Sequence, residues 1–225
     1  MKFYRLLLLL LATSLSATLY GAEQPTSIGD FALLDHQGKF HQLSWYDDQK
    51  AVVIYIQGNG CPIARNGALT LRAIRDDFAG QGVEFFMLNP QPQDDRDSIA
   101  AEAAEFNYDF PILLDKSQLV AESLGVDRTS EVFVIDPKTL QVLYHGPIDD
   151  RLGYEAQKPE AQNHYLRDAL TAVLSGTAVA QGAPEAPGCL ISFPARDKYQ
   201  NTTISYADDI APILMENCVS CHHDG

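Results

Sequence analysis

The sequence predicts an α/β domain with a mixed central sheet flanked by helices, followed by a short helical C-terminal segment. In the first half, β-rich apolar runs alternate with amphipathic segments, which is typical of parallel strands joined by helices. In the second half, two apolar runs are separated only by Pro137-Lys138-Thr139, which is typical of an antiparallel hairpin. The chain of 225 residues is long enough for one well-packed domain and an appendage.

Residues 1–22 are interpreted as a secretory signal peptide. Lys2 and Arg5 precede an uncharged run from Leu6 to Tyr20, which is too short to span a bilayer comfortably. An uncleaved membrane anchor is the alternative, and it is the only link to a membrane that the sequence predicts. We therefore expect an exported protein, periplasmic or secreted.

The domain itself is predicted to cover residues 23–176. Its longest apolar run, Ala51–Gln57, has the pattern of a strand buried on both faces. Gly58-Asn59-Gly60 ends this strand, and Pro62 stands at the first position of the next helix, where proline is tolerated. The apolar positions that make this helix amphipathic are Ile63, Leu69, Leu71, Ile74 and Phe78. In chain order, the elements predicted so far are strands at 31–35, 40–46 and 51–57, a helix at 62–78 and a strand at 83–89.

The rest of the domain follows the same rules. Gly125 and Gly176 each end a predicted helix, at the position where helices commonly stop at glycine. The remaining elements are helices at 98–106, 119–124 and 164–174 and strands at 111–114, 131–136 and 140–145. Small residues, Gly and Pro dominate the start of the segment 177–203, which is predicted to be a linker or tail lying over the domain. A second short unit is predicted at 204–225.

The charge and the cysteine content narrow the function. Thirty acidic residues against sixteen basic ones give a net charge of −14, which repels phosphate backbones, so nucleic acid is not an expected partner. Two of the four cysteines stand alone and two form a C-x-x-C motif, a spacing that predicts two different chemistries. The remaining histidines are scattered and are interpreted as surface or turn residues rather than ligands: His36, His41, His145 and His164.

Cys61 has the setting of a reactive thiol. It lies where the central predicted strand leads into a helix, and the unpaired amide groups and dipole at a helix N-terminus favour the thiolate. Arg65, one turn along, is expected to add a cation on the same face. A thiolate attacks disulfides, sulfenic acids and peroxides. A buried structural cysteine is the alternative interpretation.

Two stretches carry a family resemblance. VVIYIQGNGCPIA at 52–64 and EVFVID at 131–136, with the alternation between them, resemble the redoxin branch of the thioredoxin superfamily, the alkyl hydroperoxide reductase and thiol-specific antioxidant type. The resemblance covers residues 28–174. It implies a thioredoxin-like fold and an oxidoreductase that acts on thiol, disulfide or peroxide substrates together with a redox partner protein. It also implies that Cys61 is the attacking cysteine.

The chain departs from the family pattern at several positions. A dithiol thioredoxin has a second cysteine where this chain has Ala64. A typical peroxiredoxin has Thr and Pro before its cysteine, where this chain has Gly58 and Ile54. Ser130 takes the place of the cis-proline of thioredoxins and of the peroxiredoxin arginine, with Arg128 out of register. A one-cysteine hydroperoxide peroxidase and a catalytically silent redoxin module are therefore alternatives to a thiol-disulfide oxidoreductase.

Cys189 is the other cysteine that stands alone. Its approach, Pro187-Gly188, would let the chain fold back over the active face. Three interpretations remain open. Cys189 is a resolving partner of Cys61, or it forms a static disulfide, or it is a free thiol.

The last cysteines form a c-type haem attachment motif. In Cys218-Val219-Ser220-Cys221-His222 the two thiols would form thioethers with the haem and the histidine would ligate the iron. The preceding ISYADDIAPILMENC resembles the first helix of small cytochrome c domains, so we expect haem c on a truncated cytochrome c-like segment. The alternatives are an ordinary disulfide or a zinc site formed by Cys218, Cys221, His222 and His223.

Overall fold

The computed structural model describes most of the chain, and the predicted signal peptide, residues 1–22, lies outside the described residues. Among those described, no helix combines the length and the apolar character needed to cross a bilayer. The described residues are 27–154, 156–199, 203–219 and 221–222.

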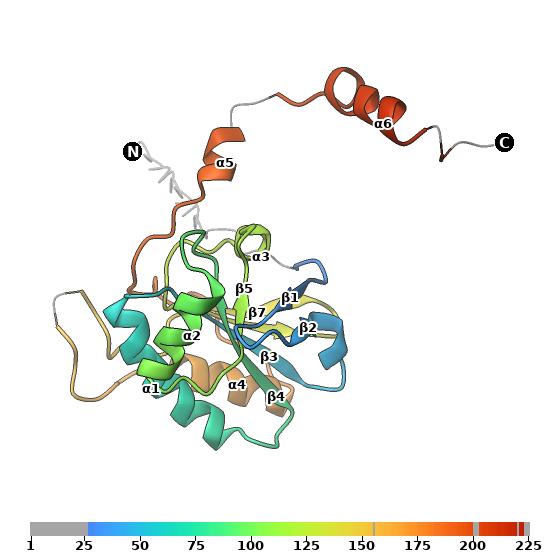
Figure 1. Cartoon of the computed structure of the whole chain (residues 1–225). Helices are drawn as coiled ribbons and strands as arrows, with labels where there is room; N and C mark the ends of the chain where they lie inside the picture. Colours follow the sequence, from blue (N-terminus) through green and yellow to red (C-terminus); the bar gives the residue numbers. More distant parts are fainter. Residues whose placement is uncertain (1–26, 155, 200–202, 220, 223–225) are drawn as a thin grey trace, which may run out of the picture.

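The strands confirm the predicted mixed sheet. They are β1 (Ala32–Leu34), β2 (Phe40–Gln42), β3 (Ala51–Ile56), β4 (Val83–Asn89), β5 (Ile112–Leu114), β6 (Val132–Asp136) and β7 (Gln141–Gly146). The central sheet has the order β5-β4-β3-β6-β7. β4 pairs in parallel with β3 and β5, whereas β6 runs antiparallel to β3 and β7, as the hairpin pattern predicted. β1 and β2 form a separate antiparallel ribbon next to β5 (Figure 1).

The helices begin and end largely where the sequence predicts. α3 and α4 each stop at a glycine in the left-handed conformation, Gly125 and Gly176. Leu69 was predicted on the buried side of α1 but is 60 % exposed, because the buried stripe of that helix runs through Ala68 and Leu71. α5 was not predicted. The α-helices are α1 (Pro62–Asp77), α2 (Arg96–Glu105), α3 (Leu119–Leu124), α4 (Tyr165–Ser175), α5 (Pro194–Tyr199) and α6 (Ala211–Asn217).

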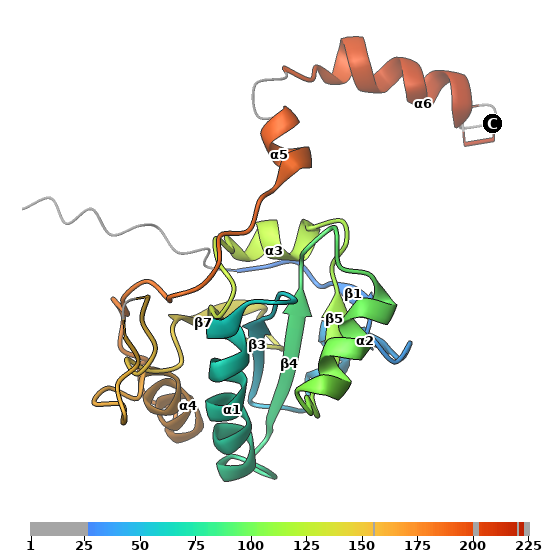
Figure 2. The ribbon, with the colours of Figure 1, turned by 60° about the vertical axis from the view of Figure 1, so that its left-hand side comes forward.

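The sheet separates two hydrophobic cores. Side chains on a strand point alternately to the two faces, so Val53 and Tyr55 of β3 pack with α1, α2 and α4, while Val52, Ile54 and Ile56 pack with α3 and the ribbon. Figure 2 shows α1, α2 and α4 in front of the sheet and α3 at the end where β3 leads into α1. The domain therefore has a thioredoxin-like α/β fold, and the start of α1 lies at the end of its central strand.

The segment predicted as a linker or tail is packed against the domain as far as Phe193. We call residues 186–193 the strap. Ala186, Ile191 and Phe193 are buried, and the last two belong to the same core as α3. The strap therefore forms part of the folded domain.

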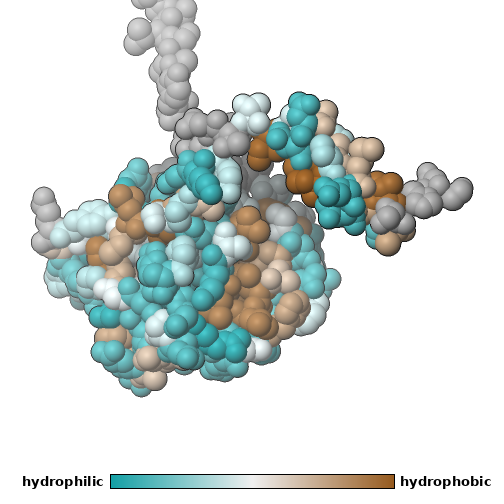
Figure 3. Space-filling view, turned by 45° about the horizontal axis from the view of Figure 1, so that its top comes forward, coloured by the Kyte–Doolittle hydropathy of each residue, from teal (hydrophilic) through white to brown (hydrophobic). Residues whose placement is uncertain are grey.

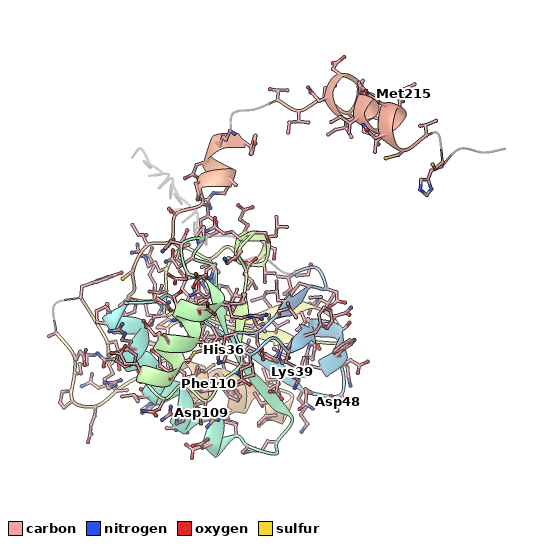
Figure 4. The ribbon with its side chains drawn as sticks, viewed as in Figure 1. His36, Lys39, Asp48, Asp109, Phe110 and Met215 are labelled. Carbon is pink, nitrogen blue, oxygen red and sulfur yellow. The ribbon has the colours of Figure 1, made fainter. Side chains whose placement is uncertain are left out.

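Beyond the strap, the chain leaves the domain. α5, a π-helical turn at Tyr206–Ile210 and α6 project away from it (Figure 1). Met215 lies on α6, apart from the domain that holds His36 and Phe110 (Figure 4). Figure 3 shows brown apolar side chains on this projecting segment, where Ile213 and Met215 are exposed.

Candidate active site

Cys61 is the residue immediately before the first turn of α1. Its backbone is extended, and Pro62 follows it at the start of the helix, as the sequence predicted. The Cys61 side chain is only 3 % exposed and belongs to the core between the sheet and α1. The backbone N–H of Ala64, in the first turn, donates a hydrogen bond to the thiol, and the N-terminal end of the helix favours a negative charge at this position.

The strap brings Cys189 to Cys61. It pairs antiparallel with the segment that precedes β6, through a hydrogen bond from Thr129 N to Cys189 O of 2.9 Å and one from Ile191 N to Asp127 O of 2.9 Å. The Sγ atoms of Cys61 and Cys189 lie 3.1 Å apart, and both are free thiols. Two cysteines separated by 128 positions in the chain thus meet in one site.

Gly188 and Tyr154 determine how closely the strap approaches. A Cβ atom on Gly188 would lie 1.9 Å from the carbonyl oxygen of Thr129, a distance that no real contact permits. The Tyr154 hydroxyl accepts a hydrogen bond from Gly188 N at 3.0 Å and donates one to Gly188 O at 2.8 Å. Arg128 also donates to this hydroxyl. Glycine is therefore required immediately before Cys189 in this arrangement.

Their surroundings shift the pKa values of the two thiols in opposite directions. Burial by itself raises the pKa of Cys61, but hydrogen bonds from Thr129, from the Ala64 backbone and from Cys189 outweigh it, so this pKa lies below its ordinary value. The pKa of Cys189 is raised, first because its thiol donates a hydrogen bond to Cys61 and then because of burial. Cys61 therefore loses its proton at a lower pH than Cys189 does.

Arg65 does not play the role that the sequence predicted for it. Its guanidinium binds Glu102 through two hydrogen bonds of 3.1 and 3.0 Å and stacks on the Phe106 ring. Glu102 also accepts a hydrogen bond from Gly60 N at 3.0 Å. The pair fixes the loop before Cys61, while the Arg65 charge is balanced by a carboxylate. Glu102 lies on α2, and no signal in the sequence linked it to this loop.

A second polar network holds the other side of the same loop. Asn59 N donates to the Asp94 carboxylate at 3.0 Å, and Asn89 bridges Asp94 and Gln57 with contacts of 2.9 and 2.7 Å. Asp94, Asn89 and Gln57 are all buried. Because buried polar groups of this kind are costly to leave unpaired, the network restricts the loop to one conformation.

The segment before β6 carries Thr129, a site residue that the sequence did not predict, next to Ser130. Ser130, at the place expected for a cis-proline, has φ of 71°, and none of the described peptide bonds is cis. Ser130 N donates to Ile56 O at 2.7 Å, which ties this residue to the end of β3. The preceding residue, Thr129, is fully buried, and its Oγ1 lies 3.1 Å from Cys61 Sγ.

Two of the four histidines interpreted as surface or turn residues are buried: His36, which does lie in a turn, and His41, for which the interpretation was wrong. His41 Nε2 lies 3.0 Å from an Asp35 oxygen, and His41 Nδ1 lies 2.7 Å from the Tyr46 hydroxyl. His36 lies in the turn that follows Asp35, and its Nδ1 accepts a hydrogen bond from Ile112 N. Both imidazoles are buried because local polar partners satisfy them.

Cys218, Cys221 and His222 follow α6, which projects away from the domain that holds α1 and Cys61 (Figure 1). Cys218, Cys221 and His222 share one turn after α6, in which Cys221 N and His222 N both donate to Cys218 O. In the described part of the chain, no cluster of three or more His, Cys, Asp or Glu side chains is arranged to hold a metal ion. His223, the fourth ligand of the alternative zinc site, lies outside the described residues.

The family model of the AhpC/TSA family matches residues 26–143. The chain belongs to the AhpC/TSA family. This AhpC/TSA domain is also 27% identical, over 138 residues, to the thiol-disulfide oxidoreductase ResA of Geobacillus thermodenitrificans, covering 58% of this chain and 78% of ResA. The chain is thus a redoxin and an oxidoreductase of thiol chemistry.

Solved structures resemble this redoxin over most of their length. A hypothetical protein from Sinorhizobium meliloti 1021 is 29% identical, with a TM-score of 0.67, covering 76% of this chain and 94% of that one. An uncharacterised conserved protein from Geobacillus kaustophilus is 26% identical, with a TM-score of 0.68, covering 77% of this chain and 94% of that one. Both similarities support the fold of the domain.

Proposed function

We propose that this redoxin is an exported thiol-disulfide oxidoreductase in which Cys61 is the nucleophile and Cys189 the resolving cysteine, on a chain that also carries covalent haem c. The observation that supports the thiol cycle is the 3.1 Å distance between the two sulfur atoms. A disulfide bond is about 2.0 Å long. A shift of the strap by roughly 1 Å therefore suffices to join the two cysteines.

The proposed cycle has two exchange steps. The Cys61 thiolate attacks one sulfur of a substrate disulfide, so a mixed disulfide forms and the other substrate sulfur leaves as a thiolate that takes up a proton. Cys189 then loses its proton and attacks Cys61 Sγ. The second substrate sulfur leaves, and a Cys61–Cys189 disulfide remains. The substrate disulfide gains two electrons, which the protein dithiol loses, and an external dithiol partner restores the reduced protein.

Access to Cys61 requires the strap to move. Cys61 is 3 % exposed, whereas Cys189 lies on the exposed side of the site. Buried Ala186 and Ile191 anchor the strap on either side of Cys189. Between these anchors, backbone hydrogen bonds and the Tyr154 contact hold it, and opening of this part would leave the strands of the sheet paired. A substrate sulfur therefore reaches Cys61 in an opened state, and closure of the strap returns Cys189 for the second step.

A hydroperoxide is the second class of oxidant that the family supports. The Cys61 thiolate would attack the terminal peroxide oxygen, the O–O bond would break, and a sulfenic acid would form while the alkoxide leaves and takes up a proton from solvent to become an alcohol. Cys189 would then condense with the sulfenic acid, releasing water and forming the same disulfide. The position of Cys189 favours this two-cysteine cycle over the one-cysteine peroxidase that the sequence left open.

The export and haem parts of the proposal rest on the predicted signal peptide and on the C-terminal motif. Cys218, Cys221 and His222 lie on one turn, in which Cys218 is half-buried and the other two are exposed, so the donor set fits thioether attachment and axial ligation. A bound haem would supply one-electron transfer. The chain's own residues would hold the haem on the turn after α6. Three apolar side chains of α6 itself are exposed: Ile213, Leu214 and Met215. A redox partner protein is expected to supply or take the electrons.

Mass spectrometry of the exported full-length protein tests both parts. Oxidation with a small disulfide should produce a Cys61–Cys189 crosslink within one chain, and expression with haem maturation machinery should add one haem to the peptide that contains Cys218 and Cys221. A crosslink between any other pair would overturn the thiol assignment. An unmodified C-terminal peptide would overturn the haem assignment and leave the thiol assignment intact.

A further inference from the structure

We propose that Thr129 is a further catalytic residue, whose hydroxyl donates a hydrogen bond to the Cys61 thiolate while it holds the backbone of the resolving cysteine. This inference rests on the proposed function and concerns the same pair of cysteines. It assigns to one side chain the stabilisation of the nucleophile and the placement of its partner. The sequence marks Thr129 only as a neighbour of Ser130.

The contacts of the Thr129 hydroxyl determine the direction of its hydrogen bond. Oγ1 accepts the backbone N–H of Cys189 at 2.9 Å and lies 3.1 Å from Cys61 Sγ. A hydroxyl has a single hydrogen and two lone pairs. Because the Cys189 N–H occupies a lone pair, the hydrogen remains available to the sulfur. Thr129 is fully buried, so bulk water does not compete for it.

Gly58 provides the space that this arrangement needs. A Cβ atom at position 58 would lie 2.8 Å from the Thr129 Cγ2 methyl, so a larger residue there would force the Thr129 side chain or the loop to shift. Position 58 is where a typical peroxiredoxin has a threonine before its cysteine. In this chain the threonine hydroxyl reaches the sulfur from the segment before β6 instead, and the glycine and the threonine depend on each other.

The backbone fixes Thr129 in place. Its N–H donates to Cys189 O at 2.9 Å, and the next residue, Ser130, donates to Ile56 O at 2.7 Å. The strap and the central strand therefore hold Thr129 from both sides. A side chain that is fixed before reaction loses little entropy when it stabilises the developing charge.

The same hydrogen bond acts when the protein disulfide is reduced. Cys189 is the exposed sulfur and Cys61 the buried one, so an external thiolate attacks Cys189 Sγ. A mixed disulfide forms on Cys189, and the sulfur–sulfur bond electrons leave with Cys61, which becomes a thiolate. Thiolates of lower pKa leave faster. The Thr129 hydroxyl stabilises this leaving group, and a second thiol of the reductant then releases Cys189.

The two tyrosines that interact electrostatically with Cys61 stay uncharged in the range where the thiolate forms. Burial raises the pKa of Tyr108 to about 12 and raises that of Tyr55 still further, so both phenols stay neutral. Arg65, on the same helix, is paired with Glu102. Cys189 is the remaining titrating neighbour, and serine in its place keeps a hydrogen-bond donor.

The experiment compares Thr129→Val and Thr129→Ser in the full chain, with Cys189, Cys218 and Cys221 replaced by serine so that only Cys61 titrates. Thiolate absorbance in the ultraviolet is followed against pH. Valine keeps the methyl beside Gly58 but removes the hydroxyl, so the pKa of Cys61 should rise by about one unit. Serine keeps the hydroxyl and should retain the parent value. Thr171→Val, an exposed threonine on α4, is the matched control and should change nothing.

The outcomes separate this inference from the proposed function. An unchanged pKa in Thr129→Val, or an equal rise in Thr129→Ser, would overturn the role of the hydroxyl. The same Thr129 variants with all cysteines present should still form the Cys61–Cys189 crosslink at a pH above both pKa values, because the thiolates then form without help. Loss of the crosslink in the parent protein would instead overturn the proposed function.

Discussion

The two pairs of cysteines in this chain lie in contrasting surroundings. Cys61 and Cys189 are 128 positions apart, yet their sulfur atoms meet in a site built by a strand end, a helix start and the strap. Cys218 and Cys221 are three positions apart and lie on one turn of a segment that projects from the domain. One pair depends on the tertiary fold and the other on local sequence.

This contrast follows from what each chemistry requires. Thiol exchange needs a stabilised thiolate and a second sulfur close to it, and because this chain has Ala64 in place of a local second cysteine, the packed strap has to supply that sulfur. Attachment of haem needs two thiols and a histidine at a fixed spacing, which a single turn provides. We therefore expect substitutions to separate the two functions, with effects that depend on how far each residue contributes to the tertiary site.

The largest expected effect is that replacing cysteines of one pair abolishes the function of that pair and leaves the function of the other pair intact. Cys61→Ser should abolish exchange with a small disulfide and leave haem attachment intact. Replacement of both Cys218 and Cys221 by serine should prevent haem attachment and leave exchange unchanged. Exchange assays and intact mass measured on the same preparations check both expectations. Coupled losses would show that the two regions are not independent.

Gly188→Ala should cause the next largest effect. The added Cβ would lie 1.9 Å from Thr129 O, so the strap must shift and move Cys189 away from Cys61. Misplacement of a reacting group by about 1 Å can slow a reaction about a hundredfold. Quenched mass spectrometry should show slow closure of the intramolecular disulfide after Cys61 has reacted. Gly29→Ala, where the added atom meets nothing within 4 Å, is the control, and an equal rate in both variants would contradict the steric argument.

The predictability of each feature from sequence follows the same contrast. Cys61 was identified because strand, glycine loop and Pro62 are adjacent in the chain, and the fold was predicted because apolar runs mark its strands and helices. The proximity of Cys189 remained one of three interpretations. The strap docks through backbone hydrogen bonds, which leave no side-chain pattern, and only the glycine before Cys189 hints at the close approach.

Residues that act through long-range contacts were missed for related reasons. Glu102 reaches Gly60 N from another helix, so no spacing rule connects the two. Thr129 resembles any loop threonine until its neighbours are known. Arg65 was expected to face Cys61 because residues four apart share a helix face, but its pairing with Glu102 depends on the packing of α2 against α1. His41 is buried because Asp35 and Tyr46 satisfy its ring.

Because the two thiols have different pKa values, the amount of mixed disulfide that accumulates should depend on pH. The pKa of Cys61 is lowered, so its thiolate forms at lower pH and is lost only as the pH falls through that lowered value. Once Cys61 is in a mixed disulfide, Cys189 loses the charge of its neighbour, but burial still opposes its thiolate. Rapid acid quenching and mass spectrometry should therefore find more mixed disulfide at the acidic end of the active range. A mixed disulfide that accumulates instead at alkaline pH would contradict this order.

The smallest expected effect concerns Arg65 and shows how far its charge reaches. Glu102→Gln keeps an oxygen that can accept the Gly60 N–H but removes the negative charge that balances the Arg65 guanidinium. The unbalanced cation, one turn from Cys61, should lower the pKa of Cys61 further. The shift should be roughly 0.3 units, because Arg65 is partly exposed and solvent screens its charge. Thiolate absorbance against pH measures it, with Glu160→Gln, an exposed position, as the control. A higher pKa of Cys61 in Glu102→Gln would contradict this expectation and show that Glu102 acts on Cys61 mainly by anchoring the loop. A lower pKa would show that the Arg65 charge acts on Cys61 once Glu102 no longer balances it.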